Sequence, residues 1–361
     1  MSGRAARAAV RLAAAAGAAA ALLACTAGAT VPAAKTAPVG GAHSPPTQSL
    51  RRFEFSQPHM GTTYRLVLLA ADEPTASRAA DAAFARIADL DRRLTDYRED
   101  SELMQASRAA AEGPVALSPD VFRVLATAQQ LAERTDGAFD VTVGALTRLW
   151  RRTRRIGEMP AARELAAARD ASGYRLLSLD PDARTMRLAR PGVRLDVGGI
   201  GKGYAADRAL ETLAAHGITR AMVVAGGDVA AADAPEGEKG WQVALAPLGD
   251  ARPVERILLA RAAVSTSGDA EQWVEIGGVR YSHMLDPRTG APLTGRRSVT
   301  VVARDATTSD MLATAAGVLG PEDGARLVEE TGGASLLFGL DTGSGARWIT
   351  SRGWPAPAWI D

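Results

Sequence analysis

Strand-like and helix-like segments alternate irregularly along most of the chain, and this arrangement restricts the fold more than any other feature. Thr63–Ala70 looks like a strand, and a helical pattern follows from Thr75 to Leu94. Ser118 and Pro119 are typical of a helix start, and a further helical pattern runs from Tyr204 to His216. The strict rhythm of a parallel strand-helix-strand sheet is missing, so we expect an α+β fold, built as one unit or as two lobes.

The N-terminal 52 residues differ in composition from the rest. Arg4, Arg7 and Arg11 precede an uncharged apolar run, Leu12 to Ala24, which is the layout of a secretory signal peptide over residues 1–24. The run is too short to span a bilayer comfortably. Small and polar residues dominate as far as Leu50 and offer little apolar surface to offset ordering entropy. We therefore expect a disordered tether at residues 25–52 and a folded domain at 53–361.

Cys25 is the only cysteine, so the chain cannot form an intramolecular disulfide. The segment Leu22-Leu23-Ala24-Cys25 resembles the bacterial lipobox, in which cleavage leaves the cysteine as a lipid-carrying N-terminal residue. This resemblance implies a protein exported and held by lipid on Cys25 at the outer face of the cytoplasmic membrane, the periplasmic side where an outer membrane exists. The alternative is an ordinary cleaved signal with an incidental thiol.

Charge is balanced, and the scarcity of lysine is its most informative aspect. The chain has 42 Lys+Arg against 41 Asp+Glu, a net charge of +1, which argues against a nucleic-acid partner. Lysine occurs only at Lys35, Lys202 and Lys239. Lys202 lies in the densest glycine cluster, Leu195–Gly203, between a β-rich run at Val193–Val197 and a helix.

This glycine cluster is a candidate phosphate site, because backbone amides and a helix N-terminus attract anions. It matches neither named motif: Gly203 follows Lys202 where a Walker loop requires Ser or Thr, and the glycines lack the dinucleotide spacing. A glycine-rich turn without a ligand is the alternative. The compact charge of Lys202 favours the phosphate interpretation.

Two further segments carry groups suited to catalysis. Asp310 and Thr314 stand one helical turn apart and offer hard oxygen ligands for magnesium, although Asp near a helix start also serves as a cap. His283 lies in a strand that leads into the turn Asp286–Gly290 and could take a proton from a hydroxyl. A hydrogen-bonded structural histidine is the alternative.

Eight segments in order resemble the ApbE family, the FAD:protein FMN transferases. They are Met60–Thr63, Leu94–Leu103, Thr135–Gly144 with Leu149-Trp150, Asp196–Tyr204, Ala225–Asp228, Ser265–Asp269, Tyr281–Gly290 and Asp310–Thr314. The departures are Ala225, where asparagine is common, Gly201, where alanine is frequent, and Ala270, where an aromatic residue is common. They affect loop details and acceptor preference.

The resemblance implies an activity and a set of site residues. Family members bind FAD, use Mg²⁺ on its pyrophosphate, and transfer FMN to a Ser or Thr hydroxyl of an acceptor protein, releasing AMP. Mixed, mostly antiparallel sheets are implied, and the partners are FAD and exported acceptor proteins of membrane redox complexes. His283 would assist the acceptor hydroxyl, and the metal ligands would be Gly199, Asp310 and Thr314. The FAD site would be lined by Met60, Tyr97, Ala138, Phe139, Asp140, Asp196, Lys202 and Leu285.

Two other functions fit the same residues. A magnesium-dependent FAD pyrophosphatase would send the phosphoryl group to water and yield free FMN and AMP. A non-catalytic lipoprotein would bind FAD without turnover.

Overall fold

An eight-stranded antiparallel sheet forms the centre of the molecule in the computed structural model, which describes residues 49–245, 248, 255–268 and 272–354. The expected signal peptide, Cys25 and nearly all of the expected tether lie outside these residues. In spatial order the strands are β1 (Arg51–His59), β2 (Thr62–Ala70), β6 (Ala221–Ala225), β7 (Asp228–Ala231), β10 (Ala262–Gly268), β14 (Arg297–Ala303), β15 (Ser335–Asp341) and β16 (Ala346–Thr350).

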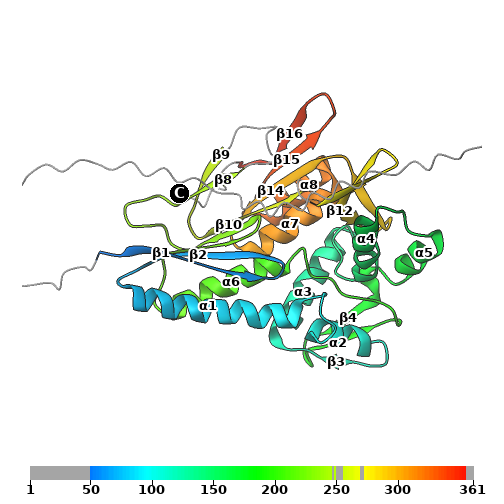
Figure 1. Ribbon diagram of the computed structural model, residues 1–361, viewed down its shortest axis with the longest axis horizontal. Coiled ribbons are helices and arrows are strands. Elements are labelled where there is room, and N and C mark those ends of the chain that lie inside the picture. Colours follow the sequence, from blue (N-terminus) through cyan, green and yellow to red (C-terminus); the bar gives the residue numbers. More distant parts are fainter. Residues whose placement is uncertain (1–48, 246–247, 249–254, 269–271, 355–361) are drawn as a thin grey trace, which may run out of the picture.

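Helices cover one face of this sheet and a hairpin covers the other (Figure 1). Leu66 and Leu68 of β2 face the helices, whereas Val67 faces the hairpin, as the two-residue period of a strand requires. The covering helices are α1 (Glu73–Leu94), α6 (Gly201–Ala215), α7 (Ala306–Leu319) and α8 (Pro321–Thr331), and the hairpin is β8 (Trp241–Leu245) with β9 (Glu255–Leu259).

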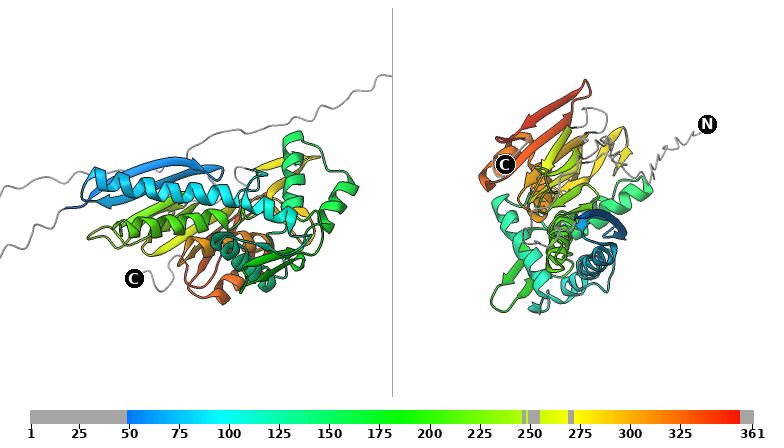
Figure 2. Two further views of the ribbon diagram at one scale, coloured as in Figure 1. Left: turned by 90° about the horizontal axis from the view of Figure 1, so that it is seen from below. Right: turned by 90° about the vertical axis from the view of Figure 1, so that its left-hand side faces the viewer.

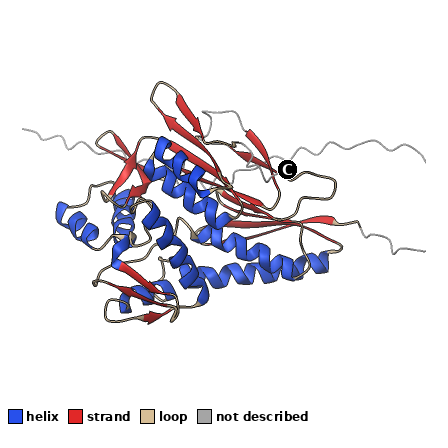
Figure 3. Ribbon diagram, turned by 180° about the vertical axis from the view of Figure 1, so that it is seen from behind, coloured by secondary structure: helices blue, strands red, loops and turns tan. Residues whose placement is uncertain are grey.

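The chain between α1 and α6 forms a smaller lobe beside the end of α1, which the view from below makes clear (Figure 2). Its elements are α2 (Glu102–Ala109), β3 (Val115–Ala116), α3 (Pro119–Arg134), α4 (Gly144–Ile156), α5 (Ala162–Asp170), the 3₁₀ turn η1 (Tyr174–Leu176), β4 (Leu177–Asp180) and β5 (Thr185–Leu188). A separate three-stranded antiparallel sheet contains β11 (Trp273–Ile276), β12 (Val279–Asp286) and β13 (Ala291–Thr294). Figure 3 shows the molecule from behind, with helices and strands in different colours.

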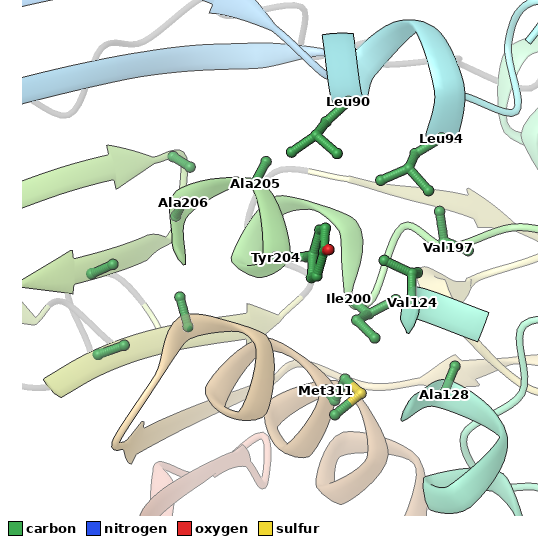
Figure 4. Close-up of a cluster of buried hydrophobic side chains, with 14 of the residues drawn as sticks. Leu90, Leu94, Val124, Ala128, Val197, Ile200, Tyr204, Ala205, Ala206 and Met311 are labelled. Carbon is green, nitrogen blue, oxygen red and sulfur yellow. The ribbon is translucent and has the colours of Figure 1, made fainter. Parts of the chain in front are cut away.

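One hydrophobic core joins the two lobes. Leu90 and Leu94 of α1, Val124 of α3, Ile200 before α6 and Met311 of α7 are all buried in the same cluster (Figure 4). The lobes are therefore packed together rather than merely linked. Ile200 and Met311 each adjoin an expected site residue in sequence, so this junction fixes the relative position of α6 and α7.

Local signals explain where several helices begin. The Ser118 hydroxyl caps α3 and Pro119 is its first residue, as expected from the sequence. Asp72 caps α1 by accepting a 2.8 Å hydrogen bond from the Thr75 amide, so the helix begins two residues before the expected Thr75. Within the described residues, no helix is long and apolar enough to cross a membrane.

The expected α+β fold with mostly antiparallel sheets is confirmed, but the β-rich run at Val193–Val197 is not a strand of any sheet. Val193–Val197 forms no ladder and makes a single isolated bridge, between Arg194 and Val143. Its backbone instead bonds the loop before α4, since the Asp196 amide donates to the Val141 carbonyl and the Gly144 amide to the Arg194 carbonyl. The first strand, β1, was not foreseen and includes Arg51 and Arg52, at the end of the span assigned to the tether.

Candidate active site

The glycine cluster leads directly into α6, which begins three residues earlier than expected, at Gly201. Ile200 occupies the N-cap position and provides no side-chain cap. The Gly203 amide instead donates a 3.1 Å hydrogen bond to the carboxylate of Asp310 on α7. The first amides of a helix lack partners within the helix and attract negative charge, and here the carboxylate of Asp310 binds one of them beside Lys202.

Lys202 is the centre of a buried charged cluster. Its Nζ lies 3.3 Å from a carboxylate oxygen of Asp310 and 3.3 Å from one of Asp228, and it donates to the Gly198 carbonyl at 3.1 Å. Both carboxylates are almost fully buried. Burial opposes the charge of the lysine, but the two acids outweigh it and raise the pKa of Lys202. Burial and the carboxylate of Asp228 raise the pKa of Asp310.

The three expected metal ligands lie together at the contact of the glycine turn with α7. A Cβ placed on Gly199 would come within 3.0 Å of the Thr314 hydroxyl oxygen, and Asp310 precedes Thr314 by one turn. The Ser267 hydroxyl, on β10, lies 3.3 Å from that of Thr314 and helps to orient it. A carboxylate, a hydroxyl and a carbonyl are all oxygen donors, so the set fits Mg²⁺. Within the described residues, no three His, Cys, Asp or Glu side chains meet as an alternative metal site.

Met60 approaches this centre from the turn between β1 and β2. Met60 and Gly61 both have positive φ, 50° and 74°, as a two-residue hairpin turn requires. The Met60 amide donates to Asp91 at 2.9 Å, and its sulfur lies 3.3 Å from the Tyr64 hydroxyl. That hydroxyl also donates to the Lys202 carbonyl at 3.2 Å. The expected FAD residue Met60 is therefore tied to Lys202 through Tyr64.

A second group of expected FAD residues is joined by Arg151 of α4. Its guanidinium donates to Asp96 and, at 2.9 Å, to Asp196, and lies 4.4 Å from the ring centroid of Tyr97. Tyr97 remains 74% exposed, so part of its ring is open to a ligand. The other oxygen of Asp196 accepts from the Gly198 amide at 2.8 Å. Asp196 thus connects the Tyr97 region to the glycine turn.

Ala138, Phe139 and Asp140 lie on the other side of the glycine turn. A Cβ on Gly199 would come within 3.2 Å of the Phe139 ring, and Ala138 is buried. Asp140 accepts 2.7 Å bonds from the amide and the hydroxyl of Thr142, and burial raises its pKa to about 6. Asp140 also borders a cavity of about 540 Å³, which Arg288 lines as well.

His283 and Leu285 come from β12, apart from the lysine cluster. Leu285 packs in the small core formed with α4. The register against β13 shifts between Tyr281 and Leu285, so His283 lies in an irregular part of the strand, a feature common beside active sites. The link to α7 is Met284, which packs against Gly317, one turn beyond Thr314.

The structure adds three residues to which the sequence interpretation gave no role. Asp228 was part of a recognised block, and its burial beside Lys202 makes it part of the charged cluster. Arg151 lies in a run of arginines on α4 that resembles an ordinary solvated face. Asp207 of α6 binds the Ala306 and Thr307 amides at the start of α7. The contacts of Arg151 and Asp207 depend on long-range packing, so no local pattern identifies them.

Comparisons with known proteins agree with this arrangement. The sequence profile of the ApbE family matches residues 60–338. The chain is 34% identical to an FAD:protein FMN transferase of Vibrio cholerae over 76% of this chain and 83% of that protein.

Solved structures extend the likeness to the fold. The flavin transferase ApbE from Vibrio cholerae matches with a TM-score of 0.75 and 30% identity, over 84% of this chain and 98% of that one. The apo flavinyl transferase ApbE of Pseudomonas stutzeri matches with a TM-score of 0.74 and 31% identity, over 84% and 96%.

Proposed function

Because this chain belongs to the ApbE family and is an enzyme of the FAD:protein FMN transferase type, we propose that it transfers FMN from FAD to a Ser or Thr hydroxyl of an acceptor protein, using Mg²⁺ and releasing AMP. The observation that carries the proposal is the meeting of Gly199, Lys202, Asp310 and Thr314 where α6 contacts α7. This is the combination of cation, oxygen ligands and helix N-terminus that a pyrophosphate requires.

The transfer is a substitution at the flavin-side phosphorus. The acceptor oxygen forms a bond to that phosphorus, the bond to the bridging oxygen breaks, and AMP leaves with that oxygen. The hydroxyl proton passes to His283, whose imidazole can hold it near neutral pH. Bound Mg²⁺, held by Asp310, Thr314 and the Gly199 carbonyl, would neutralise phosphate charge.

The protein's own groups position the substrate and stabilise its charge. Lys202 places an ammonium in a cluster that burial partly shields from water, so its attraction for phosphate is stronger than at an exposed site. The exposed ring of Tyr97 offers a surface for a flat ring of FAD. The described site presents no Cys or activated Ser of its own, in keeping with a nucleophile supplied by the acceptor.

The deciding experiment weighs the acceptor. Purified protein is incubated with FAD, Mg²⁺ and candidate exported proteins, and the acceptor mass is measured. A gain equal to one FMN residue, with AMP released in equal amount, supports transfer. Free FMN with no mass gain would instead establish a pyrophosphatase. Asp310→Ala should remove turnover while the protein remains folded by circular dichroism; undiminished AMP release would contradict the assigned metal site.

The cellular place of the reaction is part of the same proposal. A signal peptide over residues 1–24 and a lipid on Cys25 would hold the enzyme at the outer face of the cytoplasmic membrane, where exported acceptors are found. Replacing Cys25 by Ser should release the protein from the membrane fraction. Continued membrane association of that variant would contradict the lipid anchor.

A further inference from the structure

Helix α4 concentrates positive charge on a protein that is nearly neutral overall. Between Gly144 and Ile156 it carries five arginines and no acidic residue. Two of them are neutralised: Arg151 by Asp96 and Asp196, and Arg152 by Glu164. The others are Arg148, Arg154 and Arg155, here called the basic face of α4.

The basic face lacks matching acids. Arg148 is 69% exposed, and its nearest carboxylate, that of Glu99, is 3.8 Å away. Glu99 also pairs with Arg108 at 2.5 Å and with Arg194 at 2.8 Å, so one acid serves three arginines. Within the described part of the chain, neither Arg154 nor Arg155 forms an ion pair or hydrogen bond. Burial and the neighbouring Arg151 lower the pKa of Arg154, in keeping with the lack of an acidic partner.

This surface adjoins both ends of the reacting site. On one side Arg151 contacts Tyr97 and Asp196. On the other, Trp150 of α4 stacks on Tyr281, with ring centroids 6.1 Å apart, two residues before His283 on β12. Figure 1 shows α4 standing beside β12. An acceptor whose hydroxyl reaches His283 must therefore pass close to α4.

We propose that the basic face of α4 is the docking surface for an acidic segment of the acceptor protein. The inference rests on the proposed transferase function and adds the chemistry of the partner. Charge complementarity of this kind guides encounter and selects partners. Ile156, the last residue of α4, and Met159, three residues beyond it, are 44% and 50% exposed and supply apolar contact area beside the charges. Because Trp150 of α4 stacks on Tyr281 of β12, the strand that carries His283, we assign the surface to the acceptor, whose hydroxyl reacts there.

The test measures binding independently of turnover. The probes are two fluorescein-labelled peptides with one central Thr, one flanked by Asp and Glu and the other by Asn and Gln. Fluorescence anisotropy at low ionic strength should show that the wild-type protein binds the acidic peptide about tenfold more tightly than the neutral one. The double variant Arg148→Gln/Arg155→Gln should lose most of that preference, because it removes two positive charges that attract the acidic peptide. FAD affinity should stay unchanged.

The matched control is Arg326→Gln/Arg347→Gln. These arginines, on α8 and β16, are 65% and 59% exposed, so the control removes the same charge from a comparable surface elsewhere. It should bind the acidic peptide as the wild type does. Equal binding of the two peptides by the wild type, or equal losses in both double variants, would overturn the proposal.

Two further measurements separate this inference from its alternatives. Cosedimentation with phosphatidylglycerol vesicles should be the same for the wild type and the α4 variant; loss confined to vesicle binding, with peptide binding intact, would assign the surface to lipid and overturn the proposal. Absence of any mass gain on acceptors would refute the transferase function. Peptide preference would still decide the docking surface, because anisotropy requires no turnover.

Discussion

Gly203 of α6 lies so close to Ala306 of α7 that a Cβ at position 203 would overlap the Ala306 carbonyl. The same Cβ would lie 3.0 Å from the Cβ of Asp310, and the Gly203 amide already bonds the Asp310 carboxylate. The glycine is therefore required for helix contact rather than for an unusual backbone angle. The distance between Lys202 and Asp310 depends on this contact.

Gly203→Ala should consequently separate the two helices and disrupt the site. Overpacking of a close contact costs about 1–3 kcal/mol, so the free energy of unfolding should fall by that amount. The rate of FMN transfer should also fall, because the distance between Lys202 and Asp310 changes. The control is Gly201→Ala, where the nearest neighbour of a new Cβ, in Val197, is 3.6 Å away. Gly201→Ala should keep full activity and equal or higher stability. Denaturant unfolding measures the stability of each variant, and the mass gain of the acceptor measures its activity. Equal stability and equal activity of the two variants would contradict this account.

Asp207 should couple the start of α7 to α6. It accepts hydrogen bonds from the Ala306 and Thr307 amides at 2.8 and 2.9 Å, whereas Asp305, the N-cap of α7 itself, accepts from the Thr308 amide at 2.7 Å. Both Asp207→Ala and Asp305→Ala remove a cap of the same helix, worth about 1 kcal/mol or more. Only Asp207→Ala also removes hydrogen bonds that join α7 to α6.

The two variants should therefore differ in their Mg²⁺ requirement and in their affinity for FAD. Asp207→Ala should raise the Mg²⁺ concentration needed for half-maximal transfer by about fivefold or more, and calorimetry should show weaker FAD binding in Mg²⁺. Asp305→Ala should lower thermal stability and leave both values near those of the wild type. Equal changes in Mg²⁺ requirement and FAD binding in the two variants would show that Asp207 acts only as a helix cap.

Local physics made much of the fold predictable. The Ser118-Pro119 start of α3 and the strand-like run of β2 are short-range signals, and the structure reproduces them. Val193–Val197 looked like a strand for the same reason, because its apolar alternation is genuine. It is not paired as a strand because its backbone bonds the loop before α4, a partner 50 residues earlier. Strand pairing is a property of the neighbour as well as of the segment.

The site residues also fall into those that local sequence patterns predict and those that only the folded structure reveals. Lys202, Asp310 and Thr314 could be named because the glycine cluster around Lys202, the helical spacing of Asp310 and Thr314, and the family resemblance agreed. Their closeness, and the burial of Asp228 beside them, could not be read from the sequence, since β7, α6 and α7 meet only after folding. Arg151 was hidden for another reason: a run of arginines on a helix is usually a solvated surface, and only its contacts with Asp196 and Tyr97 distinguish it.

His283→Ala should separate catalysis from binding. General acid-base assistance is worth about 10²- to 10⁴-fold, so transfer should slow by at least about 10²-fold, whereas the FAD dissociation constant should change less than about threefold. Quenched-flow mass spectrometry measures the rate of transfer, and flavin fluorescence measures the FAD dissociation constant. His216→Ala, at the exposed end of α6, is the control and should match the wild type. A parallel loss of transfer and FAD binding would favour a structural role for His283.

Arg151→Gln should weaken FAD binding by about tenfold, because Arg151 holds Asp196 and one side of Tyr97 in place together. The adjacent Arg152 pairs with Glu164 at 2.8 Å on the surface, so Arg152→Gln removes the same charge from the same helix and should have little effect. Arg151→Lys keeps the charge but cannot span both Asp96 and Asp196, and should recover only part of the affinity. The Tyr97→Ala/Arg151→Gln double variant should bind FAD little worse than Tyr97→Ala alone if the arginine acts through the ring; fully additive losses would place its effect on Asp196 instead.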